Sequence, residues 1–428
     1  MRLLAEPPDG PVDEPPAIAL TDLPAGATVE LEVRTVDAAG HGWRSASSFR
    51  AGEDGRADPA RDRPLDGPYE GVDPTGPLWA MQFASAEEAP VGFVAPADRL
   101  EYALDARSGD ERGSARVVRR WSADGVRREQ LRGPGFAGPL FLPPAVDPAP
   151  AVLLVPGSTG VFALEPEGAL LASHGYCTLV AGYMGDEGLP PSLCEIPVEA
   201  LLAATRSLAA HERVDERQIA WVAASVGTQG ALAALASAEA PAVRCAVALA
   251  PSSVVWQARG AGRPPRKSSW THAGRPLPFA LVRGEQLLPQ VIARALARVV
   301  ARQARPTPLH LLPAYAAGLR DQRAAHRAAI PVERIGAPLL LISGQDDQVW
   351  PAGAMADAIV ARRSAIGRVQ GDRHVSYADA GHIIRPPIGA TTVLWTERLF
   401  SGGTPVGQAA AQAGTWQQIV QFLSDHLG

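Results

Sequence analysis

The stretch Gln218–Ala231 reads QIAWVAASVGTQGA, and it decides the fold that we expect. An apolar run enters Ala-Ala-Ser-Val-Gly, and an alanine-rich helical segment follows. The pattern is a variant of the G-x-S-x-G strand–turn–helix with Ala223 at the first glycine position. A turn this tight requires small residues two positions before and two after the serine, which Ala223 and Gly227 supply. Ser225 is therefore a candidate nucleophile above a helix N-terminus that favours an anion, with an ordinary turn serine as the alternative.

Two later segments supply partners for this serine. Leu339–Trp350 (LLLISGQDDQVW) is an apolar strand that ends in a turn with adjacent carboxylates. Tyr377–Pro387 (YADAGHIIRPP) leads into a loop that carries His382. Each residue follows a strand, and the order serine, aspartate, histidine is that of the α/β-hydrolases. The pattern predicts a triad of Ser225, Asp347 and His382, whereas a helix cap and a structural loop histidine are the alternatives for the last two.

The second half of the chain has the rhythm of a doubly wound α/β domain. Continuous apolar runs alternate with helical stretches, as strands of a parallel sheet covered on both faces do. The expected strands are Val152–Val155, Cys177–Ala181, Ile219–Ala224, Cys245–Ala250, Leu339–Ser343 and His374–Tyr377. Residues 252–330 interrupt the pattern with an alanine- and arginine-rich helix near 290–304. We interpret them as an insertion, or lid, over the carboxyl edge of the sheet, where ligands bind in such folds.

The first half has short alternating segments separated by Gly, Pro and Asp. Period-two alternation is typical of half-buried strands, and turn clusters at this spacing favour an antiparallel β-sandwich. The expected strands are Thr28–Asp37, Gly42–Ala51, Leu78–Ala84, Leu100–Ala106 and Ala115–Trp121, with a long polar loop at 52–68. We therefore predict an immunoglobulin-like sandwich at residues 1–135 and a hydrolase domain at 136–428.

The triad predicts nucleophilic catalysis at a carbonyl carbon. His382 removes the proton of Ser225, and Asp347 orients the imidazole and stabilises its charged form. The oxyanion needs fixed donors. We expect the Val226 amide and the loop Pro156–Gly160 (PGSTG), through Ser158 and Thr159, to supply them, although a plain turn is the alternative for the loop.

Composition excludes several other classes of protein. Hydrophobic residues make up 46% and charged residues 20% of the 428 residues, which is the balance of a globular protein. The sequence has no basic run interleaved with aromatic residues, so we expect no nucleic-acid partner. The sequence has no stretch of about 18 apolar residues, so we expect no membrane span. The first residues do not resemble a signal peptide. We expect a cytoplasmic enzyme that needs no metal or cofactor, because no cluster has metal-ligand spacing, and we expect its three cysteines to be reduced thiols.

At these residues the chain resembles the family of acyl-CoA thioesterases and bile acid-CoA:amino acid N-acyltransferases. The resemblance covers almost the whole chain and carries the nucleophile over to Ser225, the acid to Asp347 rather than Asp346, and the base to His382. The sequence departs from the usual family pattern at Ala223, Val226 and Arg385. The matching motifs are VDEP (12–15), DGPYEGVDPTGPLWAM (66–81), VRRE (126–129), GPLFLPP (138–144), IPVE (330–333), GQDDQVW (344–350), AGHIIRPP (380–387) and a GG…AAAQ…W segment (402–416).

The resemblance implies an acyl thioester as substrate, either acyl-CoA or a carrier-bound or biosynthetic thioester, with an ester as the alternative. We expect Trp256, Trp270 and Trp350 to contact the substrate. A serine nucleophile favours hydrolysis through an acyl-enzyme. An acyltransferase or a cyclase that passes the acyl group to an amine or a hydroxyl is the first alternative, and a catalytically inactive binding protein is the second. We expect surface solvation for four cations, with phosphate binding as the alternative; these are Arg266, Lys267, Arg362 and Arg363.

Overall fold

The structure is a computed structural model, and it describes most of the 428-residue chain. The described residues are 1–85, 90–144, 147–259, 265–300, 307–367, 370–386, 389–396 and 399–428. They form two compact units. The first comprises Met1–Ala123, Pro386–Glu397 and Thr404–Ala413, and the second comprises Asp124–Arg385, Arg398–Gly403 and Gly414–Gly428.

The first unit is built on two β-sheets. A six-stranded sheet has the order β2-β8-β7-β4-β5-β6, and β1 pairs with β3 in a two-stranded sheet. All pairs are antiparallel except β2–β8. The elements are β1 (Arg2–Glu6), β2 (Asp9–Pro11), β3 (Ala17–Thr21), β4 (Thr28–Val36), β5 (Gly42–Arg50), α1 (Gly76–Trp79), β6 (Gln82–Phe83), β7 (Arg99–Ser108) and β8 (Glu111–Arg120).

Strand β4 shows why the alternating segments form this sheet. Val29, Leu31 and Val33 are buried, while the residues between them are exposed or half-buried, as the two faces of a strand require. The strand expected at Leu78–Ala84 is wrong over most of its length. Its first residues belong to the helix α1, which begins Gly-Pro, and proline is favoured in the first turn of a helix because it has no N–H to leave unpaired there.

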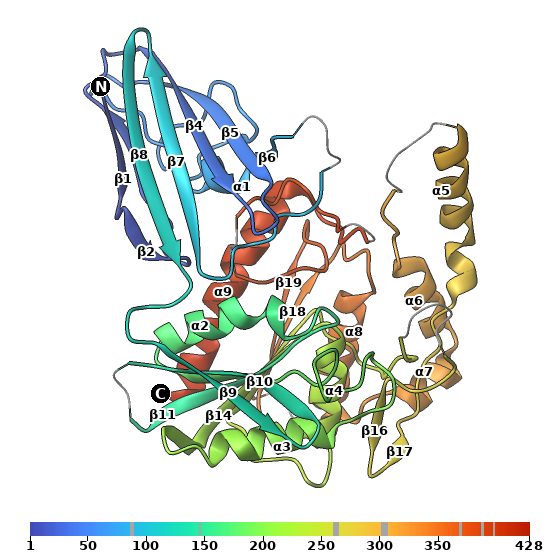
Figure 1. The fold of residues 1–428 in the computed structure, drawn as a ribbon. Coiled ribbons are helices and arrows are strands. Elements are labelled where there is room, and N and C mark those ends of the chain that lie inside the picture. The colour runs from blue at the N-terminus through green and yellow to red at the C-terminus, as the bar shows by residue number, and fades with distance from the viewer. Residues whose placement is uncertain are drawn as a thin grey trace. The chain divides into compact units, whose positions relative to one another are not determined.

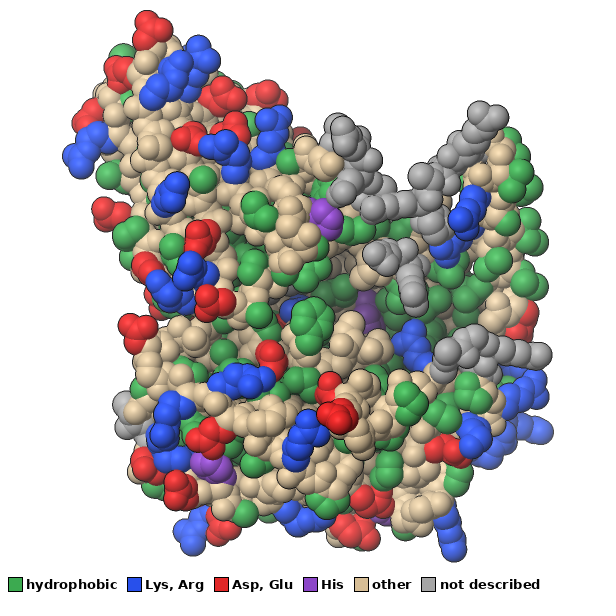
Figure 2. Space-filling model, in the orientation of Figure 1, with side chains coloured by type: hydrophobic (Ala, Val, Ile, Leu, Met, Phe, Trp, Pro, Cys, Tyr) green, Lys and Arg blue, Asp and Glu red, His purple; other side chains and the backbone are tan. Residues whose placement is uncertain are grey.

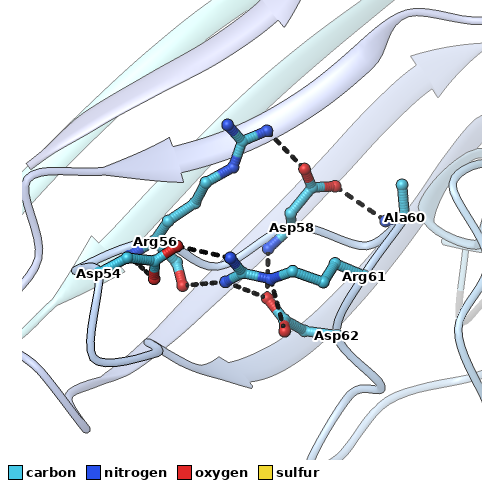
Figure 3. Close-up of polar contacts among 6 residues, drawn as sticks. All are labelled: Asp54, Arg56, Asp58, Ala60, Arg61 and Asp62. Atoms are coloured by element: carbon cyan, nitrogen blue, oxygen red, sulfur yellow. Dashed lines mark hydrogen bonds and ion pairs between the residues drawn. The ribbon is translucent and has the colours of Figure 1, made fainter.

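The polar loop at 52–68 is held by its own charged side chains (Figure 3). Arg61 donates to Asp54 at 2.6 Å and to Asp62 at 2.9 Å, and Arg56 donates to Asp58 at 2.6 Å. The two carboxylates beside Arg61 raise the pKa of its guanidinium. Five charged side chains of the loop, those of Asp54, Arg56, Asp58, Arg61 and Asp62, are therefore paired with one another, which helps so polar a stretch to keep a defined course.

The second unit contains an eight-stranded sheet with the order β19-β18-β15-β14-β11-β12-β10-β9 (Figure 1). Strands β12, β11, β14, β15, β18 and β19 run parallel, and β9 and β10 are antiparallel at one edge. The crossed order, with β12 between β10 and β11, is that of an α/β-hydrolase. The strands are β9 (Arg127–Gly133), β10 (Phe136–Leu142), β11 (Ala149–Val155), β12 (Cys177–Val180), β14 (Val214–Ala224), β15 (Cys245–Leu249), β18 (Leu339–Gly344) and β19 (Arg373–Tyr377).

The helices of this unit follow the parallel strands, and a small three-stranded sheet lies among the later elements. No helix among the described residues is both long enough and apolar enough to cross a membrane. The remaining elements are η1 (Val161–Ala163), α2 (Glu165–Ser173), β13 (Ile196–Pro197), α3 (Glu199–Ala209), α4 (Val226–Leu235), β16 (Trp270–His272), β17 (Arg275–Pro276), η2 (Gly284–Leu287), α5 (Leu288–Val300), α6 (Leu312–Arg320), α7 (Gln322–Ala328), η3 (Val332–Arg334), α8 (Ala352–Ser364) and α9 (Pro405–Leu427).

Two features of this sheet are not apparent from the sequence pattern. The hairpin β9–β10 contains the glycine- and proline-rich residues 133–139, which the sequence pattern does not assign to a strand. Strand β9 thus pairs within this sheet, although the sequence assigns residues up to 135 to the first domain. The helix expected near 290–304 is α5, and its last expected residues lie outside the described ones. The domain boundary at 135/136 and the insertion at 252–330 stay predictions.

Candidate active site

Ser225 stands between strand β14 and helix α4 in a backbone conformation that few residues adopt. Its φ is 50° and its ψ is −125°, and a non-glycine residue with positive φ is costly unless its surroundings impose it. The neighbouring strand imposes it here, because the Ser225 amide donates to the carbonyl of Leu249 in β15 at 2.9 Å. The observed geometry is that of the strained turn predicted from QIAWVAASVGTQGA.

The small residues around Ser225 are required by the packing of the turn. A Cβ on Gly227 would lie 2.4 Å from the carbonyl oxygen of Pro156, inside van der Waals contact. Ala223, two residues before the serine, is buried with 2% of its surface exposed. This position therefore accommodates a methyl group, which explains how the elbow forms without its first glycine.

Three side chains form a hydrogen-bonded relay from this turn. Ser225 Oγ lies 2.8 Å from His382 Nε2, and His382 Nδ1 lies 2.8 Å from Asp347 Oδ2. An imidazole that donates from Nδ1 to a carboxylate leaves Nε2 to accept the serine proton. The structure therefore brings together the three residues that the sequence analysis predicted as a triad.

The carboxylate of Asp347 is buried and fixed from its other side. The residue is 3% exposed, and its Oδ1 accepts from the backbone amides of Val349 at 2.8 Å and Trp350 at 3.1 Å. These amides orient the carboxylate and compensate for its loss of water. Its neighbour Asp346 bonds elsewhere, to the Gly403 amide at 2.8 Å and the Gln348 side chain at 2.6 Å.

The loops that carry the acid and the base are linked to each other by main-chain hydrogen bonds. The Gln345 amide donates to Tyr377 at 2.9 Å, and the Asp346 amide donates to Ala380 at 3.1 Å. The His382 amide donates to Ser401 at 2.8 Å. The imidazole is thus held by the backbone of the loop as well as by its ring contacts.

The predicted oxyanion donors lie on both sides of the serine. The Val226 amide is at the first position of α4. In the facing loop, a Cβ on Gly157 would come within 3.2 Å of Ser225 Cβ, so this loop approaches the nucleophile closely. Ser158 and Thr159 follow and are exposed. The roles of Val226, Ser158 and Thr159 stay predictions.

The three predicted substrate tryptophans are buried in this unit. Trp256, Trp270 and Trp350 are exposed by 2%, 0% and 1%. Trp350 packs edge-on against His382 with ring centres 5.3 Å apart, whereas Trp270 packs on Tyr183 at 4.9 Å. Only Trp350 among them contacts a triad residue through its ring, and all three substrate contacts stay predictions.

A second relay near the acid was not identified in the sequence. Ser343 Oγ lies 2.9 Å from His374 Nε2, and His374 Nδ1 lies 3.0 Å from Asp357 Oδ1. His374 and Asp357 line a cavity of about 450 Å³ that Asp347 also borders. No motif marks these residues, and the sequence analysis gave His374 no role.

An ion pair was also missed. The Arg385 Nε atom lies 2.8 Å from Glu167 Oε1 on α2. Burial raises the pKa of the Glu167 carboxyl, and Arg385 opposes that rise. Arg385 stands three residues after His382, so the pair ties the end of the histidine loop to α2.

The predicted surface cations have mixed environments. Lys267 pairs with Glu195 at 2.6 Å, and its side chain is 55% exposed. For Arg363 the surface prediction is wrong, because it is 2% exposed and is enclosed by Asp372 and three backbone carbonyls. The described residues contain no group of three His, Cys, Asp or Glu side chains arranged to hold a metal ion.

Comparisons with known proteins place both halves of the chain in one family. Residues 13–133 match the family model described as "Acyl-CoA thioester hydrolase/BAAT N-terminal region", and residues 197–428 match "BAAT / Acyl-CoA thioester hydrolase C terminal".

Similar curated proteins carry two different activities in their names. The chain is 27% identical to the acyl-coenzyme A amino acid N-acyltransferase 1 of Mus musculus, over 100% of this chain and 98% of that protein. It is 26% identical to the acyl-coenzyme A thioesterase 6 of Homo sapiens, over 97% and 94%. Among solved structures, 2,6-dihydroxy-pseudo-oxynicotine hydrolase matches 71% of this chain and 68% of that chain at 13% identity, with a TM-score of 0.40.

Proposed function

Because this chain belongs to the acyl-CoA thioester hydrolase and bile acid-CoA:amino acid N-acyltransferase family of enzymes, we propose that it hydrolyses an acyl thioester through Ser225. The observation that carries the proposal is the geometry of the serine. Its Oγ stands at a strained turn, 2.8 Å from a histidine that is itself 2.8 Å from a buried aspartate. A serine hydroxyl is a weak nucleophile unless a base takes its proton, and His382 is placed to do so.

The proposed reaction has two halves. Ser225 Oγ attacks the thioester carbonyl carbon while its proton passes to His382 Nε2. The tetrahedral oxyanion then collapses, the carbon–sulfur bond breaks, and the thiolate leaves with a proton from His382. Water attacks the resulting acyl-enzyme with His382 as base again, which releases the carboxylic acid and restores Ser225. Asp347 stays ionised throughout and stabilises the imidazolium.

Oxyanion stabilisation is proposed for the α4 amide of Val226 and for the loop at Ser158 and Thr159. A helix N-terminus offers unpaired amides to an anion, and the close approach of Gly157 to Ser225 supports a role for the loop. Of the three tryptophans, Trp350 is the best supported as a substrate contact. Its indole nitrogen is buried with no hydrogen-bond partner among the described atoms, and its ring adjoins His382.

A second candidate function is acyl transfer. An N-acyltransferase relative matches as fully as the thioesterases do, and both activities share an acyl-enzyme. The nucleophile favours hydrolysis, since a cysteine thioester is more readily intercepted by an amine than a serine ester is. The acceptor therefore decides between the two, and a cyclase would differ only in using an acceptor within the acyl group.

The test is a product analysis with purified full-length chain. Acyl-CoA substrates of several chain lengths are supplied with and without glycine, taurine or a simple alcohol, and the products are separated. If the chain is a hydrolase, free acid should form at the same rate with and without acceptor. The Ser225→Ala variant should form no free acid. Conversion to the amide or ester would support the second candidate. A folded wild-type chain that turns over no thioester and takes up no fluorophosphonate would support the inactive binding protein instead.

We also infer that the strands β1 to β8, within the residues 1–135 that the sequence assigns to the first domain, form an immunoglobulin-like sandwich. The support is the pairing of strands in a six-stranded and a two-stranded sheet, with Val29, Leu31 and Val33 of β4 buried. A cytoplasmic location remains the expectation from the sequence.

A further inference from the structure

Helix α2 contains a carboxylate where its packing would favour an apolar side chain. The seven residues from Pro166 to Ala172 are all buried, and Glu167 is the charged one among them. Figure 2 shows charged side chains of both signs spread over the visible surface, where water solvates them, whereas Glu167 is 4% exposed. A buried charge is costly unless it is paired. The partner of Glu167 should therefore explain why the charge is kept there.

That partner is Arg385. Its Nε atom lies 2.8 Å from Glu167 Oε1, and the side chain of Arg385 is 24% exposed while that of Glu167 is 5% exposed. A guanidinium keeps its charge at all relevant pH values, so it favours the ionised form of the carboxyl beside it. Removal of either side chain would leave the other charge without this partner.

Arg385 belongs to the loop that carries the base. It follows His382 by three residues, and the Ile384 amide between them donates to the His382 carbonyl at 3.2 Å. Ile384 is itself buried, with 3% of its surface exposed. The backbone from the imidazole to the guanidinium is therefore a short, tight turn, and a displacement of Arg385 should also displace His382.

Glu167 belongs to the segment on the other side of the nucleophile. It lies in the first turn of α2, and the short helix η1 separates that turn from the loop Pro156–Gly160. A Cβ on Gly157 in this loop would lie 3.2 Å from Ser225 Cβ, and His382 Nε2 lies 2.8 Å from Ser225 Oγ. The two segments thus meet at the serine, and the ion pair joins them a second time away from it.

We propose that Glu167 and Arg385 are positioning residues whose ion pair fixes the histidine loop against the loop that faces the serine. The pair thereby sets the distance from His382 Nε2 to Ser225 Oγ, and the proposal rests on the hydrolysis proposed for Ser225. A base takes a proton only within hydrogen-bond reach, and a misplacement of about 1 Å can lower a rate by about 100-fold. Loss of the pair should therefore lower the turnover rate and leave substrate binding nearly unchanged.

Steady-state kinetics and fluorophosphonate labelling of the purified full-length chain test this role. The assays are run at about pH 8, where a paired carboxyl is ionised and imidazole is neutral. Glu167→Gln keeps the shape of the side chain and removes its charge. Both kcat and the rate constant of labelling should fall by about 10- to 100-fold, while KM stays within about twofold of the wild-type value. The final extent of labelling counts the folded sites, so a slower rate at full extent is not caused by unfolding.

Substitutions at the more exposed partner test the same pair, also if Glu167→Gln fails to fold. Arg385→Met removes the charge and should lower kcat and the labelling rate as Glu167→Gln does. Arg385→Lys keeps the charge and should retain most of the activity. The double variant Glu167→Gln with Arg385→Met should lose no more than the more affected single variant, because residues that act as a unit are not additive.

Glu165→Gln is the matched control. Glu165 lies in the same turn of α2 and pairs with Arg128 on β9 at 2.6 Å. The same substitution therefore breaks an ion pair that does not involve the histidine loop, and it should leave kcat and the labelling rate unchanged.

The positioning role is overturned if folded Glu167→Gln or Arg385→Met keeps the wild-type kcat and labelling rate, or if Glu165→Gln loses as much. An effect confined to KM, or losses that multiply in the double variant, would overturn it too. Labelling needs no acyl substrate, so it separates this role from the proposed hydrolysis. A chain that is labelled at Ser225 but hydrolyses no thioester would refute the hydrolysis, and its labelling rates would still decide on the pair. A wild-type chain that takes up no label would overturn both.

Discussion

Two serine–histidine–aspartate relays lie in the same unit and have almost the same internal distances. In both, the serine hydroxyl is within 2.9 Å of Nε2, and Nδ1 is within 3.0 Å of a carboxylate oxygen. Nothing in these distances marks one of them as a site of chemistry. The relays are Ser225–His382–Asp347 and Ser343–His374–Asp357.

The serines differ in their backbone surroundings. Ser225 has a φ of 50° and immediately precedes helix α4, and the first turn of a helix has amides without an intrahelical partner. Ser343 lies inside strand β18 and is completely buried. A hydroxyl inside a strand has no adjacent helix N-terminus to stabilise an oxyanion. The difference teaches that the strained turn, and not the hydrogen-bonded relay, identifies the candidate nucleophile.

The aspartates differ as much. The side chain of Asp347 is 2% exposed and accepts two backbone amides, whereas that of Asp357 is 76% exposed. A carboxylate in water is screened and loosely oriented, so it stabilises an imidazolium weakly. We therefore expect every matched pair of substitutions in the two relays to have unequal effects.

The largest expected effect is at the serines. Ser225→Ala should lower kcat for thioester hydrolysis by about 10⁶-fold, the order seen when a triad serine is removed. Ser343→Ala removes only a buried hydrogen bond, which costs about 1 kcal/mol of stability, and should leave kcat essentially unchanged. Steady-state kinetics on both purified variants measures the contrast. Equal losses would place the chemistry elsewhere.

The aspartates should show the next largest contrast. Asp347→Asn keeps the shape of the side chain but favours the wrong tautomer of His382, and kcat should fall about 10⁴-fold. Asp357→Asn in the other relay should change kcat little, because its carboxylate is exposed to water. Kinetics of the two variants under identical conditions checks this. A full rate in Asp347→Asn would contradict the assigned role of His382.

Alanine substitution of the glycine beside each relay should change the free energy of unfolding by different amounts. Gly227→Ala forces a methyl group to within 2.4 Å of the Pro156 oxygen, and overpacking of this kind costs about 1–3 kcal/mol. Gly353→Ala on α8 meets nothing closer than 3.7 Å, at Ser343 Oγ. Alanine there should be neutral or stabilise by up to about 1 kcal/mol. The free energy of unfolding in urea measures both, and equal values would show that the turn at Ser225 is not tight.

The smallest expected effect concerns the buried acid that pairs with Arg385. Burial raises the pKa of Glu167 in the folded chain, so the folded state holds this proton more firmly than the unfolded state does. The free energy of unfolding should therefore fall as the pH rises from the ordinary carboxyl range through the folded pKa. Each pKa unit between the two states corresponds to about 1.4 kcal/mol.

Glu167→Gln should remove this slope from a plot of unfolding free energy against pH. A matched variant at an exposed carboxylate, Asp357→Asn, should retain it. If Glu167→Gln and the wild-type chain have parallel profiles, the carboxyl does not change its pKa on folding.

The sequence predicted the central strands and the relay for a definite reason. Short continuous apolar runs that alternate with helical stretches favour strands buried on both faces, and the crowded turn at Ser225 limits its neighbours to small residues. Asp347 could be found because it follows such a strand, β18, and His382 because it stands in the loop after the last strand, β19, in the chain order of an α/β-hydrolase triad. Strand β10 could not be found, because Gly138 and Pro139 within it read as turn residues. The Ser343 relay and the Arg385–Glu167 pair are tertiary contacts between segments that carry no local signal.

The most direct test of the central claim is to trap the acyl-enzyme and locate it. The chain is mixed with an acyl thioester, quenched in acid within one turnover, digested with trypsin and mapped by mass spectrometry. Cleavage after arginine separates the two serines into the peptides Gln218–Arg244 and Ile335–Arg362. The account predicts that the acyl group is on the first peptide, at Ser225. An acyl group on Ser343, or turnover with no acylated peptide at any quench time, would contradict it.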